Sequence, residues 1–112
     1  MKLFFSSTKN EKLFNSSKEL QKKFGEEQSN KIKIRLKTLE SAANLAEVST
    51  NKPERCHQLK GNRKGQFAVD LNHPFQLIFK PSEPIPTTED GGIDLRQVTN
   101  IIILGVEDYH GD

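Results

Sequence analysis

The feature that most constrains the fold is a continuous apolar run near the end of the chain, Ile101-Ile102-Ile103-Leu104, inside the segment from Val98 to Val106. Its β-branched residues favour an extended strand, because their side chains pack well on a pleated surface. A run without polar alternation is typical of a strand that is buried on both faces. We therefore expect this strand in the middle of a sheet, ending at about Val106.

Length and composition predict one domain over residues 1–112, because a chain of 112 residues can bury a single core. No apolar run approaches the roughly 20 residues that cross a bilayer. The first seven residues hold three apolar side chains after Met1, where a signal peptide needs about seven. We therefore expect a cytoplasmic protein with no membrane partner. The one cysteine, Cys56, excludes an internal disulfide and a multi-cysteine zinc site.

The first part of the chain predicts an edge strand and two helices. Lys2 to Ser6 is short, apolar and aromatic, as edge strands often are. Thr8 to Glu11 has the form of a capping box, and Ser16 offers a second helix start that would interrupt the first helix. Gly25 is placed to end that helix. A second helix follows, so the two form an αα-hairpin.

The second helix is predicted to bury one stripe and to expose the rest. Its buried positions follow helical spacing: Ile32, Leu36, Leu39, Ala43 and Ala46. The cations between them are expected on a solvated face, with contact to RNA as the alternative: Lys31, Lys33, Arg35 and Lys37.

Two further strands are predicted by alternating apolar residues. Residues 66–71 and 75–79 each alternate, and Asn72-His73-Pro74 between them forms a turn, so they pair as a hairpin. The prolines and glycines of residues 81–97 predict a long loop, whose charged residues up to Leu95 are all acidic. The fold class is therefore α+β, with the helices on one face of a mostly antiparallel four-stranded sheet.

The middle of the chain holds the most basic segment. Residues 52–64 carry five cations and one anion, Glu54, with His57 among them; the cations are Lys52, Arg55, Lys60, Arg63 and Lys64. Gly61 and Gly65 let the backbone turn, and Leu59 and Phe67 are the apolar side chains that would pin such a loop to a core. This pattern suits a chain of phosphates, whereas the alternative is a solvated basic surface loop.

The polar tail Glu107-Asp108-Tyr109-His110 follows the apolar strand directly. A carboxylate, a phenol and an imidazole at the end of a rigid strand suit a catalytic site. The alternative is a polar tail whose tyrosine packs back on the sheet.

Together these segments resemble the HigB toxins of the RelE/ParE superfamily of toxin–antitoxin systems. The resemblance covers residues 53–80 and 98–110, through the motif His57-Gln-Leu-Lys-Gly-Asn-Arg-Lys-Gly65 and the terminal Asp108-Tyr109-His110. It implies a RelE-like fold, a ribosome-dependent mRNA endoribonuclease, and a neutralising helix-turn-helix antitoxin of the HigA type. Two departures stand out: Gln76 lies where the family usually has arginine, and the 81–97 loop is long.

The resemblance assigns His57, Asp108, Tyr109 and His110 to catalysis, and Lys60 and Arg63 to the cationic positions of the same loop. The neighbouring cations Arg55 and Lys64 are expected to add phosphate contacts. In RNA cleavage the 2′-hydroxyl attacks the adjacent phosphorus, so no metal or other cofactor is expected. Two histidines can share the base and acid roles, and their assignment stays open.

The remaining catalytic candidates have supporting roles. Asp108 would orient an imidazole or act as the base, and Tyr109 would stack on a base or bond near the phosphate. Cys56 is expected to be a small buried residue rather than a nucleophile, and His73 to be a turn residue. Two rival functions remain: a non-nucleolytic toxin of the same fold that binds a protein such as gyrase, and a catalytically degenerate paralogue, which Gln76 favours.

Overall fold

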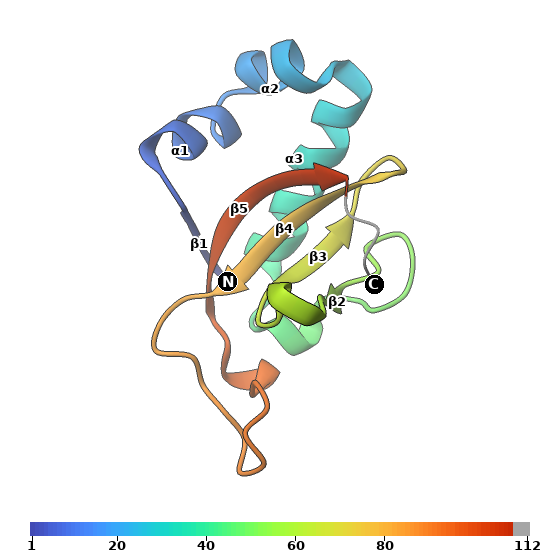
Figure 1. The fold of residues 1–112 in the computed structure, drawn as a ribbon. Coiled ribbons are helices and arrows are strands. Elements are labelled where there is room, and N and C mark those ends of the chain that lie inside the picture. Colours follow the sequence, from blue (N-terminus) through green and yellow to red (C-terminus); the bar gives the residue numbers. More distant parts are fainter. Residues whose placement is uncertain (109–112) are drawn as a thin grey trace.

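The fold is built on a five-stranded sheet with the strand order β1-β5-β4-β3-β2, in a computed structural model that describes residues 1–108 (Figure 1). The strands are β1 (Lys2–Phe5), β2 (His57–Gln58), β3 (Phe67–Asp70), β4 (Phe75–Pro81) and β5 (Asn100–Asp108). β1 pairs in parallel with β5, and every other pair is antiparallel. The predicted α+β class and edge strand are confirmed. The predicted four-stranded sheet is wrong by one strand, because the two residues of β2 are too few to display an alternating pattern.

Three helices precede the sheet's hairpin: α1 (Thr8–Phe14), α2 (Ser17–Phe24) and α3 (Glu26–Ser41). The predicted interruption of the first helix is confirmed, since Ser16 caps α2 by accepting a hydrogen bond from the Glu19 N–H at 3.1 Å. The cap of α1 is Ser7 rather than Thr8, because the Ser7 hydroxyl accepts the Asn10 N–H at 3.0 Å. At Gly25 the backbone has φ +83°, a conformation that favours glycine, and the chain turns there from α2 into α3.

α3 packs across one face of the sheet and corrects two predictions (Figure 1). It ends at Ser41, so Ala43 and Ala46 are exposed rather than part of a buried helical stripe. A 3₁₀ turn, η1 (Leu45–Glu47), follows and turns Leu45 into the core instead.

Arg35 is the second correction, because its residue is only 4% exposed, although it was expected on a solvated face. It follows Ile32 by three residues and precedes Leu39 by four, so helical spacing puts it on the buried stripe.

The core lies between α2–α3 and the sheet. Alternate residues of three strands form its sheet side: Phe67, Val69, Leu77, Phe79, Ile101 and Ile103. β4 is the middle strand and is buried on both faces from Gln76 to Phe79. β5 lies inside the sheet between β1 and β4, as expected, but its Ile102 and Leu104 are only half-buried, so the expectation of burial on both faces is wrong. On the far face of the sheet, the residues that the structure describes form a small apolar cluster of Leu59, Ala68 and Ile78, with Leu104 packed against it.

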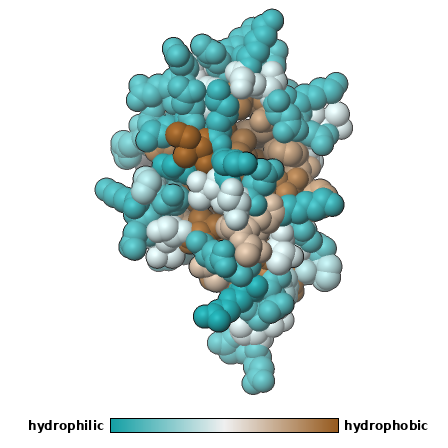
Figure 2. All heavy atoms as spheres, turned by 180° about the vertical axis from the view of Figure 1, so that it is seen from behind, coloured by the Kyte–Doolittle hydropathy of each residue, from teal (hydrophilic) through white to brown (hydrophobic). Residues whose placement is uncertain are grey.

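The surface seen from behind is mostly hydrophilic, with smaller hydrophobic areas between the hydrophilic side chains (Figure 2). The predicted long loop leads from β4 to β5 and projects from the body (Figure 1). It contains one isolated bridge, Thr87 to Ile93, and the 3₁₀ turn η3 (Leu95–Gln97). Within residues 1–108, no helix combines the length and the apolar character that a membrane span requires.

Candidate functional site

Strand register brings a set of polar side chains onto the face of the sheet away from α3, which we call the open face. Asp70 of β3 pairs with Gln76 of β4, which pairs in turn with Glu107 of β5. Directly paired residues point to the same face, so these three form one row across the sheet. The next row begins with His57 of β2, which pairs with Ala68. The open face therefore joins residues from four strands.

His57 is held by the backbone of the segment that precedes it. Its Nδ1 lies 2.7 Å from the carbonyl oxygen of Arg55. A carbonyl only accepts hydrogen bonds, so Nδ1 carries the proton in this contact and Nε2 is the nitrogen that can take one up. The backbone of Arg55 has φ +46°, a strained conformation that is rare for residues with a side chain. In this conformation the Arg55 carbonyl points toward the His57 imidazole.

The Arg55 side chain turns to Asp70. Its Nε donates to Asp70 Oδ2 at 2.8 Å and its Nη2 donates to Oδ1 at 3.0 Å. Gln76, only 5% exposed, donates from Nε2 to Asp70 Oδ1 at 3.2 Å. Burial acts to raise the pKa of Asp70, but the hydrogen bond and charge of Arg55, the Gln76 hydrogen bond and the charge of His57 outweigh it and lower that pKa from its ordinary value. Gln76 thus belongs to a network that holds Asp70 ionised.

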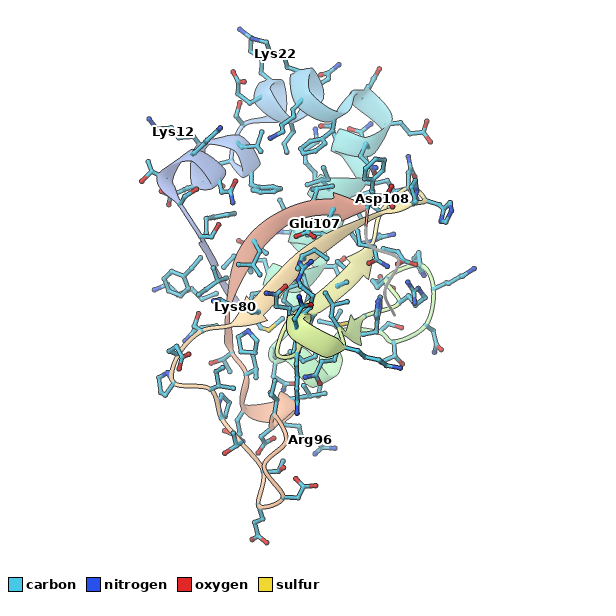
Figure 3. The ribbon with its side chains drawn as sticks, in the orientation of Figure 1. Lys12, Lys22, Lys80, Arg96, Glu107 and Asp108 are labelled. Carbon is cyan, nitrogen blue, oxygen red and sulfur yellow. The ribbon has the colours of Figure 1, made fainter. Side chains whose placement is uncertain are left out.

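Arg63 lies in the 3₁₀ turn η2 (Gly61–Arg63) and faces Glu107. Its Nη1 and Nη2 donate to the two Glu107 carboxylate oxygens at 2.9 and 2.8 Å, and its Nε donates to Gln66 Oε1 at 2.8 Å. Lys60 and Lys64 flank the turn and are exposed. In Figure 3, Glu107 lies at the front of the sheet, far from Lys12, Lys22 and Arg96.

The apolar anchors of the basic loop are confirmed. Leu59 is 2% exposed and Phe67 is 3% exposed. The turn between them is tight, because Gly61 and Gly65 both have positive φ, +65° and +93°. The sequence-predicted residues Arg55, His57, Lys60, Arg63 and Lys64 are therefore carried by one anchored segment beside the open face.

The two described residues of the polar tail, Glu107 and Asp108, lie on opposite faces of the sheet. Asp108 pairs with Phe75, so it lies in the row of β4 residues that face α3, while Glu107 lies on the open face. β5 also runs two residues beyond its predicted end at about Val106. Tyr109 and His110 lie outside the described residues. The structure thus brings Glu107, which was not among the predicted site residues, to the basic loop.

Sequence reasoning missed Asp70 and Glu107 as partners of the predicted arginines. Asp70 alternates with buried Val69, a signal that places it on the face away from the core. No comparable signal exists for Glu107, because a register shift opposite Ile78 and Phe79 changes which β5 residues share a face.

Two other candidates lie outside this cluster. Cys56 is buried, as predicted, and burial raises the pKa of its thiol to about 12, which leaves it protonated and unreactive at neutral pH. His73 is exposed in the turn between β3 and β4. Among residues 1–108, no group of three or more His, Cys, Asp or Glu side chains gathers in a way that could hold a metal ion.

Comparison with known proteins gives a match among solved structures. No protein-family model and no curated protein matches the chain. A chain in the solved structure of the YoeB-YefM complex from Staphylococcus aureus matches with 17% sequence identity and a TM-score of 0.55. The match covers 98% of this chain and 97% of that chain. At this identity the likeness establishes a shared fold over nearly the whole length of both chains.

Proposed function

We propose that this chain is the toxin of a type II toxin–antitoxin system, an endoribonuclease that cleaves mRNA on the ribosome in the cytoplasm. The observation that carries the proposal is the placement of His57 beside the basic loop, where the Arg55 carbonyl engages its Nδ1. The HigB-like motif and the fold shared with a chain of the YoeB-YefM complex support the same conclusion.

In the proposed reaction His57 Nε2 removes the proton from the 2′-hydroxyl of the RNA. The 2′-oxygen then bonds to the adjacent phosphorus, the bond to the 5′-oxygen breaks, and a second group protonates the departing oxygen. His110 is the proposed acid, with Asp108 and Tyr109 in supporting roles. The products are a 2′,3′-cyclic phosphate and a 5′-hydroxyl, and each proton transfer contributes about 10²- to 10⁴-fold.

The phosphate is held by cations of the basic loop in this proposal. Lys60 and Lys64 are exposed on both sides of η2, while Arg63 and Arg55 carry the planar guanidinium forks that suit phosphate oxygens. These few contacts would bind free RNA weakly and in a salt-sensitive way. The ribosome would supply the missing orientation of the mRNA, and a helix-turn-helix antitoxin of the HigA type would block the site.

The decisive experiment compares purified protein on free mRNA and on the same mRNA in programmed ribosomes. We expect fast cleavage only on ribosomes, with 2′,3′-cyclic phosphate ends or their hydrolysis products. Cleavage should also persist with EDTA at levels that leave ribosomes intact. Equal rates on both substrates would overturn the ribosome-dependent mechanism, and a strict need for metal beyond that of the ribosome would overturn the histidine chemistry.

The second candidate is a non-nucleolytic toxin or a catalytically degenerate paralogue. It is favoured by one observation: both arginines of the basic loop are engaged by carboxylates, Arg55 by Asp70 and Arg63 by Glu107. Arrest of DNA replication with intact mRNA on expression would identify a gyrase-type toxin. Expression without any arrest would identify a degenerate paralogue.

A further inference from the structure

The Arg63 guanidinium binds different partners on its two sides. The Nε side is bound by Gln66, a neutral neighbour three residues along the chain, at 2.8 Å. The Nη1 and Nη2 side forms two parallel hydrogen bonds to Glu107, which lies 44 residues away on β5. Gln66 thus holds one edge of the guanidinium plane, while the outer fork carries an anion.

The outer fork has the geometry that binds a phosphodiester. Two Nη–H groups in one plane match two oxygens of a phosphate as well as they match the two oxygens of a carboxylate. Lys60 and Lys64, on either side of the η2 turn, add positive charge without occupying the fork. Glu107 thus occupies the place that a phosphate oxygen pair would take.

The Arg63–Glu107 pair is exposed enough for another anion to replace Glu107. The Arg63 side chain is 24% exposed and that of Glu107 is 40% exposed, so solvent reaches both. Ion pairs in such positions contribute little net stability, because water and salt screen them. An entering phosphate can therefore displace Glu107 without disturbing the core. The Arg55–Asp70 pair differs in one respect, since Asp70 is also bound by the buried Gln76.

We propose that Arg63 and Gln66 form a phosphodiester subsite, and that Glu107 is an internal competitor that fills this subsite until RNA displaces it. The identity of the ligand as RNA rests on the proposed function. The competition lowers the affinity for any single phosphate, so the subsite engages only when the RNA is delivered at high local concentration. Glu107 would in this way help to restrict the protein to RNA that is already positioned.

Binding to two probes tests this inference without requiring cleavage. The probes are inorganic phosphate and a short single-stranded RNA whose 2′-hydroxyls are methylated. Glu107→Gln keeps the side-chain length and removes the charge, and we expect it to bind both probes about two- to tenfold more tightly than the wild type does, in line with the modest strength of an exposed pair. Glu83→Gln, in the exposed 81–97 loop, removes the same charge elsewhere and is the matched control.

A second pair of variants assigns the effect to the fork. Adding Arg63→Ala should abolish the gain, so that the double variant binds no better than Arg63→Ala alone. Unchanged or weaker binding by Glu107→Gln would overturn the inference and make Glu107 a positioning residue for Arg63. An equal gain in Glu83→Gln would also overturn it, because the effect would then be general electrostatics.

A wild-type measurement covers the case in which Glu107→Gln does not fold. Titration with inorganic phosphate should shift the NMR signals of the Arg63 Nε–H and the Glu107 carboxylate carbon together. Movement of neither signal would overturn the inference. Competition at this subsite in a protein that does not cleave mRNA on ribosomes would refute the proposed function and leave the inference intact.

Discussion

Arg35, in the middle of α3, donates a hydrogen bond from Nε to the backbone carbonyl of Asp70 at 2.7 Å, and this bond joins the helix to the end of β3. Its Nη2 also donates to the carbonyl of Pro53 at 3.3 Å. The buried Arg35 guanidinium thus holds Pro53, at the start of the basic segment, and Asp70, whose carboxylate binds Arg55. Helix α3 therefore supports the open face through the core.

Replacement of Arg35 by leucine should destabilise the fold. The half-buried Asp70 carbonyl would lose its donor, and an unsatisfied buried polar group costs about 1–3 kcal/mol, whereas Pro53 is exposed. We expect the free energy of unfolding to fall by about 2–4 kcal/mol in urea denaturation. Lys33→Leu, at an exposed position of the same helix, is the control and should change it by less than about 0.5 kcal/mol. An equal effect of both variants would contradict the role of Arg35 as a buried anchor.

Asp70 should make stability depend on pH at the acid end. Its pKa is lowered in the fold from an ordinary value of 3.8, so its contribution is fully present above about pH 4 and is lost as pH falls through the lower folded pKa. Asp70→Asn should therefore be less stable than the wild type at neutral pH, and the difference should shrink below about pH 4. Urea denaturation from about pH 7 to about pH 2.5 measures this. A difference that stays constant over that range would mean that Asp70 titrates alike in both states.

His57→Ala should relieve toxicity while the fold remains. His57 is half-buried on the two-residue strand β2, and the one contact that we describe for its ring is the bond to the Arg55 carbonyl. Loss of that bond costs about 1 kcal/mol, whereas loss of a general base costs about 10²- to 10⁴-fold in cleavage rate. Growth on induction and cleavage on programmed ribosomes give the readouts. His73→Ala, in an exposed turn, is the control and should stay fully toxic. Full toxicity of His57→Ala as well would contradict the role of His57 as the base.

The thiol of Cys56 should resist alkylation in the native protein. Burial raises its pKa to about 12, so the thiolate fraction near pH 8 is about one part in ten thousand. Mass spectrometry after iodoacetamide treatment should find Cys56 unmodified until urea is added. Cys56→Ala should keep full cleavage activity. Rapid labelling of the native protein would contradict the buried position.

Removal of residues 109–112 should abolish activity at little cost in stability. The described pairing of β5 with β4 ends at Asp108 opposite Phe75, so a chain of residues 1–108 retains the strand pairs that the structure describes. The proposed acid, His110, would be lost. Thermal unfolding and the ribosome assay separate the two effects. A truncated protein that unfolds would show that the tail belongs to the core, in agreement with the alternative of a packed tyrosine.

Much of the fold is encoded locally and could be predicted. The edge strand, the interrupted first helix, the αα-hairpin and the β3–β4 hairpin all follow from caps, glycines and apolar spacing over a few residues. The basic loop and its anchors Leu59 and Phe67 were found in the same way. The errors arose where local spacing was misleading or too short: Arg35 continues an apolar stripe although it is charged, and β2 has only two residues.

The sequence by itself thus determined the order of the elements, the apolar faces that they bury and the segment that carries the basic residues. Only the tertiary structure decided which charges meet, because Arg55 and Asp70 are separated by 15 residues and Arg63 and Glu107 by 44. Those meetings depend on strand register and on one register shift between β4 and β5, which place Glu107 on the open face and Asp108 on the other. Register is a property of paired strands, set by packing and hydrogen bonds between segments that are distant in the chain.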